Sequence, residues 1–160
     1  MFWTAMLHRS YASYSVADSC KDYLGSLGVA NGIFANPDDT GKFYIRLKHR
    51  NSLETWSSVP VSFDYLTMQI NYAFRSDITS ALGNNMIEVD TTPQRFGLYS
   101  GDVNQQGFIV LTDVLIVYND ASVFTIGYKV TDVNGDNFTD LSDVLITNNN
   151  AVRFVSRIVP

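Results

Sequence analysis

The 160-residue sequence predicts a protein of the α+β class that is built in two segments along the chain. Short apolar runs at roughly ten-residue spacing, separated by Gly, Asn and Pro, indicate an antiparallel β-sandwich in residues 1–97. A gapless internal repeat indicates a small α-helical domain of two loop–helix units in residues 98–160. The apolar fraction of 46% and the charged fraction of 17% are typical of a folded chain.

The clearest strand of the first segment is expected at residues 42–49. Phe43, Ile45 and Leu47 alternate there with polar and basic side chains. This period of two places one set of side chains toward the core and the other toward water. His49 falls on the apolar face, which favours a half-buried structural histidine over a catalytic one. Further strands are expected at residues 2–7, 16–24, 55–63 and 65–74.

Two residues define local features of this segment. Pro60 has no N–H to donate, so residues 55–63 are expected at a sheet edge. Asp77 and Gly83 are suited to begin and end a helix, which predicts one helical turn between them. A domain boundary is expected near residue 98.

The internal repeat aligns residues 102–125 with residues 132–155 at an offset of thirty, and half of the positions are identical. Each copy is expected to contain a short helix of about three turns or fewer that starts at its apolar run and stops near the asparagines. The β-branched residues in these runs are weak helix formers. Packing of one repeat on the other must therefore stabilise the helices, and Phe124 and Phe154 are the expected core anchors.

Residues 132–143 have oxygen-bearing side chains at positions 1, 3, 5, 9 and 12 of a twelve-residue loop. This spacing is typical of a calcium loop, since calcium binds six to eight hard oxygen ligands. Asn137 lies at the sixth position, where the turn requires a positive φ. The expected ligands are the side chains of Asp132, Asn134, Asp136 and Asp143, the carbonyl of Phe138, and Asp140 through a water molecule.

Residues 102–113 form a weaker copy of this loop, with Gly107 at the turn. Gln106 replaces the acid at position 5, and Val110 at position 9 has no side-chain oxygen. Two carboxylates instead of four predict lower calcium affinity, so the second loop should fill first. The alternative is that both stretches are only Asp- and Asn-rich turns. The expected ligands are Asp102, Asn104, Gln106, Phe108 (carbonyl) and Asp113.

Composition disfavours several other functions. The net charge of −5 disfavours nucleic-acid binding. No stretch approaches the roughly 20 apolar residues that span a membrane, and the N-terminus lacks a signal-peptide pattern. The single cysteine, Cys20, allows no disulfide within the chain, and no nucleophile elbow or phosphate loop is present. We therefore expect no enzyme, while Trp3 and Trp56 leave open a sugar-stacking face.

The repeated motifs Gly101-Asp-Val-Asn-Gln-Gln-Gly and Thr131-Asp-Val-Asn-Gly-Asp-Asn, each followed by Leu-(Thr/Ser)-Asp-Val-Leu, resemble the duplicated segments of type I dockerin domains. The resemblance covers residues 98–160. It implies an extracellular module that folds with calcium and a cohesin-like or other extracellular protein as partner, or the adjacent β-sandwich. The family's recognition pair falls on Leu111-Thr112 and Leu141-Ser142.

The upstream segments 44–56, 83–90 and 96–102 resemble a β-sandwich region of the immunoglobulin or transthyretin kind. Such regions precede dockerin-like tails in large secreted proteins of Bacteroidetes and Ignavibacteria-type bacteria. Those relatives have a longer N-terminal part, so the resemblance implies a truncated sandwich. The expected function is a non-catalytic calcium-binding docking module at the C-terminus of a secreted or cell-surface protein. The alternatives are a carbohydrate-binding sandwich on a calcium-stabilised stalk, or the non-catalytic tail of a secreted glycosidase or peptidase.

Overall fold

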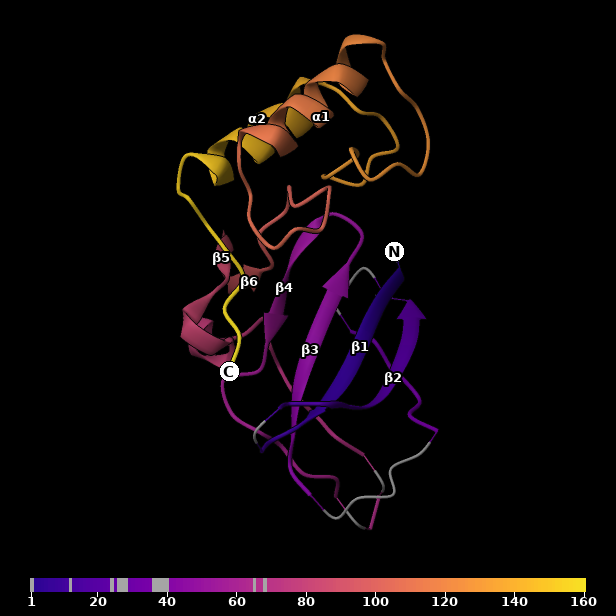
Figure 1. Ribbon diagram of the computed structural model, residues 1–160, viewed down its shortest axis with the longest axis vertical. Coiled ribbons are helices and arrows are strands. Elements are labelled where there is room, and N and C mark those ends of the chain that lie inside the picture. The colour runs from indigo at the N-terminus through magenta and orange to yellow at the C-terminus, as the bar shows by residue number, and fades with distance from the viewer. Residues whose placement is uncertain are drawn as a thin grey trace. The chain divides into compact units, whose positions relative to one another are not determined.

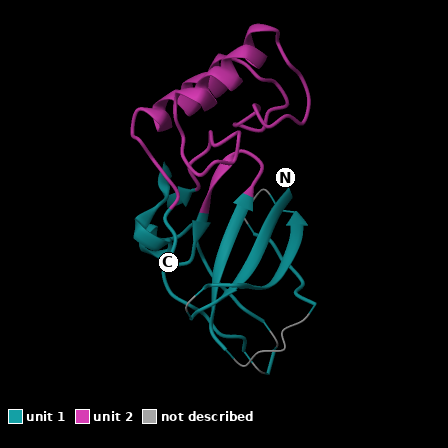
Figure 2. Cartoon of the chain, viewed as in Figure 1, with its two compact units in different colours: residues 1–48, 55–97, 158–160 teal, residues 49–54, 98–157 magenta. Residues whose placement is uncertain are grey.

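The computed structural model describes residues 2–11, 13–23, 25, 29–35, 41–64, 66–67 and 69–160. These residues form a four-stranded sheet, a two-stranded sheet and two α-helices, so the protein is of the mixed α+β class (Figure 1). The chain divides into two compact units (Figure 2). Unit 1 comprises residues 1–48, 55–97 and 158–160, and unit 2 comprises residues 49–54 and 98–157.

The four-stranded sheet has the order β2–β1–β3–β4 (Figure 1). Its central strand β1 pairs antiparallel with both β2 and β3. The expected strand at residues 42–49 is confirmed, and so is its alternation, since Phe43, Ile45 and His49 are buried. The four strands are β1 (Phe2–Arg9), β2 (Val16–Tyr23), β3 (Phe43–His49) and β4 (Ser52–Trp56).

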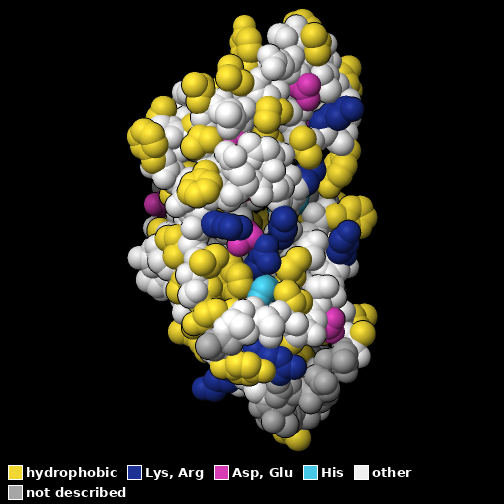
Figure 3. Space-filling view, in the orientation of Figure 1, with side chains coloured by type: hydrophobic (Ala, Val, Ile, Leu, Met, Phe, Trp, Pro, Cys, Tyr) yellow, Lys and Arg dark blue, Asp and Glu magenta, His cyan; other side chains and the backbone are white. Residues whose placement is uncertain are grey.

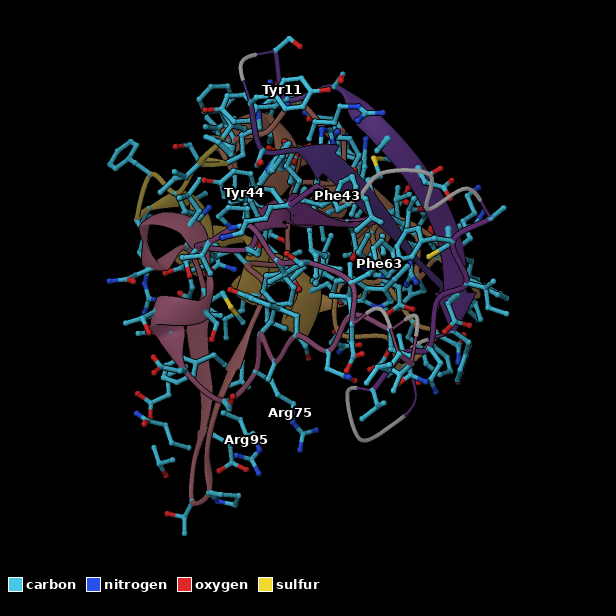
Figure 4. The ribbon with its side chains drawn as sticks, turned by 90° about the horizontal axis from the view of Figure 1, so that it is seen from below. Tyr11, Phe43, Tyr44, Phe63, Arg75 and Arg95 are labelled. Atoms are coloured by element: carbon cyan, nitrogen blue, oxygen red, sulfur yellow. The ribbon has the colours of Figure 1, made fainter. Side chains whose placement is uncertain are left out.

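The core of unit 1 is covered by a loop segment. Leu7, Phe43 and Ile45 form its buried centre, and partly buried side chains of residues 61–74 pack against it. The rings of Phe43 and Phe63 meet edge to face with their centroids 6.0 Å apart (Figure 4). In the described residues the apolar side of this sheet therefore packs against a loop. These residues do not form a closed two-sheet sandwich.

Two expected strands of unit 1 are wrong in their extent. The expected strand at residues 55–63 begins earlier, as β4, and ends at Trp56. After it Ser57 and Val61 form isolated bridges to Ala81 and Phe43. For residues 65–74 the described part shows only a bridge from Asp64 to Gln69, while positions 65 and 68 lie outside the described residues. Apolar alternation in these stretches reflects side chains that pack onto the core from a loop.

Residues 77–97 form short local elements. The Asp77 carboxylate accepts a hydrogen bond from the Thr79 N–H (2.8 Å) and begins the 3₁₀ turn η1 (Ile78–Ser80), as expected. A second turn, η2 (Leu82–Asn84), contains Gly83 at φ 64°, so the prediction that Gly83 ends a single turn is wrong. The two-stranded sheet of β5 (Ile87–Thr91) and β6 (Gln94–Gly97) follows, and the Phe96 N–H donates to the carbonyl oxygen of Arg75 (3.0 Å), a residue labelled in Figure 4.

Unit 2 contains the two helices at the positions that the repeat predicts. Helix α1 spans Leu111–Ser122 and helix α2 spans Leu141–Ala151. Val103, Val117 and Val133 form a buried core between the repeats, with Val144 and Ile146 partly buried against it.

Phe124 and Phe154 are not core anchors, so that prediction is wrong. Their exposed fractions are 80% and 85%. Each follows the end of its helix with a positive φ, 52° and 54°. A residue in this conformation turns the chain away from the helix axis, and its side chain here lies in solvent instead of on the valine core.

The two repeats are joined by a pair of equivalent β-bridges. Phe108 of the first loop bridges to Ser156, which follows α2, while Phe138 of the second loop bridges to Ile126, which follows α1. Both residues of one bridge lie thirty positions from their counterparts in the other. The two hydrogen bonds that flank each bridge also correspond, with lengths between 2.8 and 3.1 Å. Each loop is thus held by the segment that follows the other repeat's helix.

The counterpart of buried Val117 in the second repeat is Thr147, which is equally buried at 0% exposure. The Thr147 hydroxyl has no hydrogen-bond partner among the described residues. Thr147→Val should therefore raise the free energy of unfolding by about 1 kcal/mol, because it removes a buried unsatisfied hydroxyl. The mirror change, Val117→Thr, should lower it by about 1–3 kcal/mol. Chemical denaturation measures both, and destabilisation by Thr147→Val would contradict the expectation.

Candidate metal-binding loops

Asp143 is the most enclosed residue of the second loop. It lies in the first turn of α2 with 0% exposure. Its Oδ1 accepts the N–H groups of Val133 (2.8 Å) and Asn134 (3.1 Å), and its Oδ2 accepts the Asp140 N–H (2.9 Å). The carboxylate therefore joins the start of the loop to the start of the helix.

The other predicted ligands of the second loop orient one another through the backbone. Asp132 Oδ1 accepts the Gly135 N–H (2.7 Å), and its Oδ2 accepts the Asn137 N–H (3.3 Å). Side chains further along accept from the N–H two residues later: Asn134 from Asp136 (2.8 Å), Asp136 from Phe138 (2.9 Å) and Asp140 from Ser142 (2.7 Å). An ionised carboxylate offers about four lone-pair positions, so these bonds leave acceptor capacity for a cation.

The first loop repeats this pattern with two losses. Asp113 Oδ1 accepts the N–H groups of Val103 (3.1 Å) and Asn104 (3.4 Å), and its Oδ2 accepts that of Val110 (3.1 Å). Position 9, however, is Val110, which makes no side-chain bond to the helix. The Gln106 side chain at position 5 donates to the Thr112 hydroxyl at 3.5 Å.

Positive φ angles occur where the loops turn. Asn137 has φ 71°, as its position 6 predicts, and Gly107 has φ 89° at the same place in the first loop. Position 4 is also left-handed in both loops, at Gln105 (59°) and Gly135 (86°). Both loops therefore have left-handed residues at positions 4 and 6 despite their different ligands.

The donor chemistry of the second loop fits a hard cation such as calcium, since every side-chain ligand is an oxygen. Among the residues that the structure describes, no group of three or more His, Cys, Asp or Glu side chains is gathered closely enough to hold a metal ion. The carboxylates point to backbone N–H groups, and the predicted set also relies on an amide and a main-chain carbonyl. Calcium ligation by these residues stays a prediction.

The tip of the β3–β4 hairpin belongs to unit 2, and sequence reasoning missed its role. Arg50 Nη2 donates to the Asp132 carbonyl oxygen (2.8 Å) and lies 3.3 Å from Asp132 Oδ2. Asn51 Nδ2 donates to the same carbonyl oxygen (2.8 Å), while the Asn51 carbonyl oxygen accepts the Gly101 N–H (2.7 Å). Ser52 and Ser100 form an isolated antiparallel bridge. The tip therefore contacts the beginnings of both loops.

His49 at the start of this tip is 4% exposed. Its pKa is lowered from 6.5 to about 4, mainly by burial and then by the adjacent Arg50 charge. The folded protein therefore keeps the imidazole neutral at pH values where the unfolded chain protonates it. A neutral, buried imidazole beside the Ser52 hydroxyl (3.4 Å) is consistent with the structural role that its position in β3 predicts.

The His49 shift predicts a pH dependence of stability. As pH falls from about 6.5 to 4, the unfolded state binds a proton that the folded state does not, so stability falls by up to about 3 kcal/mol. His49→Gln should remove this part of the dependence while leaving the contribution of the carboxylates. Denaturation of both proteins across pH 4–7.5 measures the difference, and parallel curves would contradict it.

Other residues singled out by the sequence lie in unit 1. Trp56 is 5% exposed and contacts the tilted His8 ring at 4.3 Å between ring centroids, so it offers no open ring face to a sugar. Burial raises the pKa of the Cys20 thiol, and Asp22 and Asp18 raise it further. That shift disfavours the thiolate, the nucleophilic form.

No family model, curated protein or solved structure matches this chain. The dockerin resemblance therefore rests on the loop motifs. Within the described residues, neither helix has the length and apolar character needed to cross a bilayer.

Proposed function

We propose that this chain is a non-catalytic, calcium-stabilised docking module of an extracellular protein. In this proposal unit 2 is a dockerin-like pair of loop–helix units, and unit 1 derives from a β-sandwich region. One observation supports it most. Asp113 and Asp143, thirty residues apart and both at 0% exposure, each accept three corresponding backbone N–H groups.

The second loop is the calcium site of this proposal. Four carboxylates within twelve residues repel one another, and a divalent cation offsets that repulsion. Asp132, Asn134, Asp136 and Asp143 would hold the ion through side-chain oxygens, with the Phe138 carbonyl and Asp140 completing the set. In the first loop Asp102, Asn104, Gln106, Phe108 and Asp113 would hold calcium more weakly, because only two of its ligands are charged.

The docking surface of this proposal is the exposed side of the helices. Leu111 and Leu141 occupy the recognition positions and are 68% and 74% exposed, and Leu115 and Leu145 continue the row one turn later. Figure 3 shows hydrophobic side chains exposed on unit 2. In the presence of calcium, a partner protein that binds the wild-type chain in a pull-down should not bind the double variant Leu111→Asp and Leu141→Asp. Because both side chains are exposed, the unfolding temperature should not change.

Thermal unfolding with and without calcium tests the metal proposal. Calcium at 100 times its dissociation constant should stabilise the chain by about 2.7 kcal/mol. For a unit of this size that raises the melting temperature by several degrees. Magnesium at equal ionic strength is the control, since a calcium loop prefers the larger ion. Equal melting temperatures in calcium and in chelator would contradict the proposal and favour simple Asp- and Asn-rich turns.

A further inference from the structure

The guanidinium of Arg50 is fixed against the first ligand position of the second loop. Nε donates to the Lys129 carbonyl oxygen (2.8 Å), and Nη2 donates to the Asp132 carbonyl oxygen (2.8 Å). The same Nη2 lies 3.3 Å from Asp132 Oδ2, and the Arg50 carbon Cζ lies 3.9 Å from the centroid of the Tyr128 ring. The Arg50 and Asp132 side chains are only 12% and 1% exposed.

The contacts of the Arg50 guanidinium hold its positive charge in one position. Surface ion pairs contribute little because both side chains move and water screens them. Arg50 is instead clamped by two carbonyl oxygens and an aromatic face, and its carboxylate partner is buried. The guanidinium therefore neutralises part of the loop's negative charge. Because its contacts already fix the Arg50 side chain, little further side-chain entropy is lost in holding it there.

The first loop has a different arrangement. Arg157 passes over Gly107, and its Nη1 lies 3.7 Å from Glu54 Oε1, so its ion-pair partner is a residue of the hairpin tip. The Asp102 carbonyl oxygen instead accepts a hydrogen bond from the neutral Gln105 side chain (2.7 Å). The loop with four carboxylates thus has a cation at its first ligand position, and the loop with two carboxylates has an amide near the same place.

We propose that Arg50 is a positioning residue that acts as a built-in counter-cation of the second loop. It stabilises the loop in the absence of metal, and it lowers the affinity of the same loop for calcium because both cations share the Asp132 carboxylate. The second half of this inference rests on the proposed calcium function, and the first half does not. The second loop has more carboxylates than the first, which favours a higher calcium affinity. Arg50 makes this difference in calcium affinity between the loops smaller.

The test compares the wild-type chain with Arg50→Gln and Arg50→Lys. Glutamine keeps an N–H donor without charge, and lysine keeps the charge without the planar fork. In chelator, Arg50→Gln should melt several degrees below wild type. In calorimetric titration with calcium chloride at low salt, its tight site should bind about tenfold more tightly than wild type. Arg50→Lys should bind calcium with wild-type affinity.

Two controls separate charge at the loop from charge in general. Arg153→Gln makes the same change in net charge at an exposed position after α2, and should leave both measurements unchanged. Added salt near 1 M shortens the screening length to about 3 Å, so the affinity gain of Arg50→Gln should shrink. An equal gain in Arg153→Gln would overturn the local role of Arg50.

The outcomes distinguish this inference from the calcium function itself. If the wild-type chain gives no calcium isotherm, the calcium function fails, and the melting temperatures in chelator still decide whether Arg50 is a counter-cation. Equal melting of wild type and Arg50→Gln in chelator overturns that role, and an unchanged or weaker calcium affinity overturns the shared-carboxylate role. Should Arg50→Gln be unfolded in chelator, refolding on addition of calcium supports the inference, and failure to refold overturns it.

Discussion

Replacing Asp143 by alanine is expected to remove the tight calcium response of the chain and to destabilise it even without metal. The change deletes a ligand and leaves the N–H groups of Val133, Asn134 and Asp140 without their acceptor. Hydrogen bonds to a charged acceptor contribute about 1.5–3 kcal/mol each, although losses within one network do not add fully. We expect the free energy of unfolding in chelator to fall by about 3 kcal/mol or more. Calorimetric titration and urea denaturation measure the two effects.

The repeat provides the matched control, Asp113→Ala. Asp113 is equally buried and accepts three corresponding N–H groups, so its loss in chelator should be similar. The tight calcium event should persist in Asp113→Ala, because the second loop is intact. Loss of that event in Asp113→Ala with its retention in Asp143→Ala would reverse the order of the two sites.

Giving the first loop the ligands of the second is expected to convert it into a comparable site. The double change Gln106→Asp and Val110→Asp raises its carboxylates from two to four. Affinity follows ligand charge, so calcium binding to this loop should strengthen by at least tenfold, and the isotherm should approach two similar sites. A first-loop affinity that stays at its wild-type value would contradict the assignment of these positions.

The single change Val110→Asp separates metal binding from helix capping. Val110 occupies the N-cap of α1 with extended backbone angles and no side-chain bond, whereas Asp140 caps α2 through the Ser142 N–H. Aspartate at this position should stabilise α1 by about 1 kcal/mol in chelator. A higher free energy of unfolding without calcium would show that the new carboxylate caps α1. A further increase with calcium would show that it also binds the ion.

Local patterns in the sequence were sufficient for β3, for both helices and for the turn at Asn137. Each of these depends on neighbours within a few residues: a period of two in β3, a repeated apolar run, and a position that needs positive φ. Asp113 and Asp143, at position 12 of each loop, lie in the first turns of α1 and α2, where both are buried.

Contacts between distant residues could not be predicted in this way. Nothing near Arg50 in the sequence indicates that it meets Asp132, which is 82 positions later. Phe124 and Phe154 recur at equivalent positions, and this recurrence predicts a shared core. The positive φ after each helix gives both rings the same exposed position instead. Recurrence shows that two residues have the same environment, and it does not show which environment that is.

The crossed bridges between the repeats make unit 2 indivisible. Because Phe108 pairs with the segment after α2 and Phe138 with the segment after α1, a chain with one loop and one helix would lack the segment that bridges to its own loop. Two copies of such a half could satisfy each other only if the loop of each paired with the segment that follows the helix of the other, as in a swapped dimer. In the intact chain both halves are covalently joined, so we expect a gain of order in one loop to stabilise the other through the bridged segments.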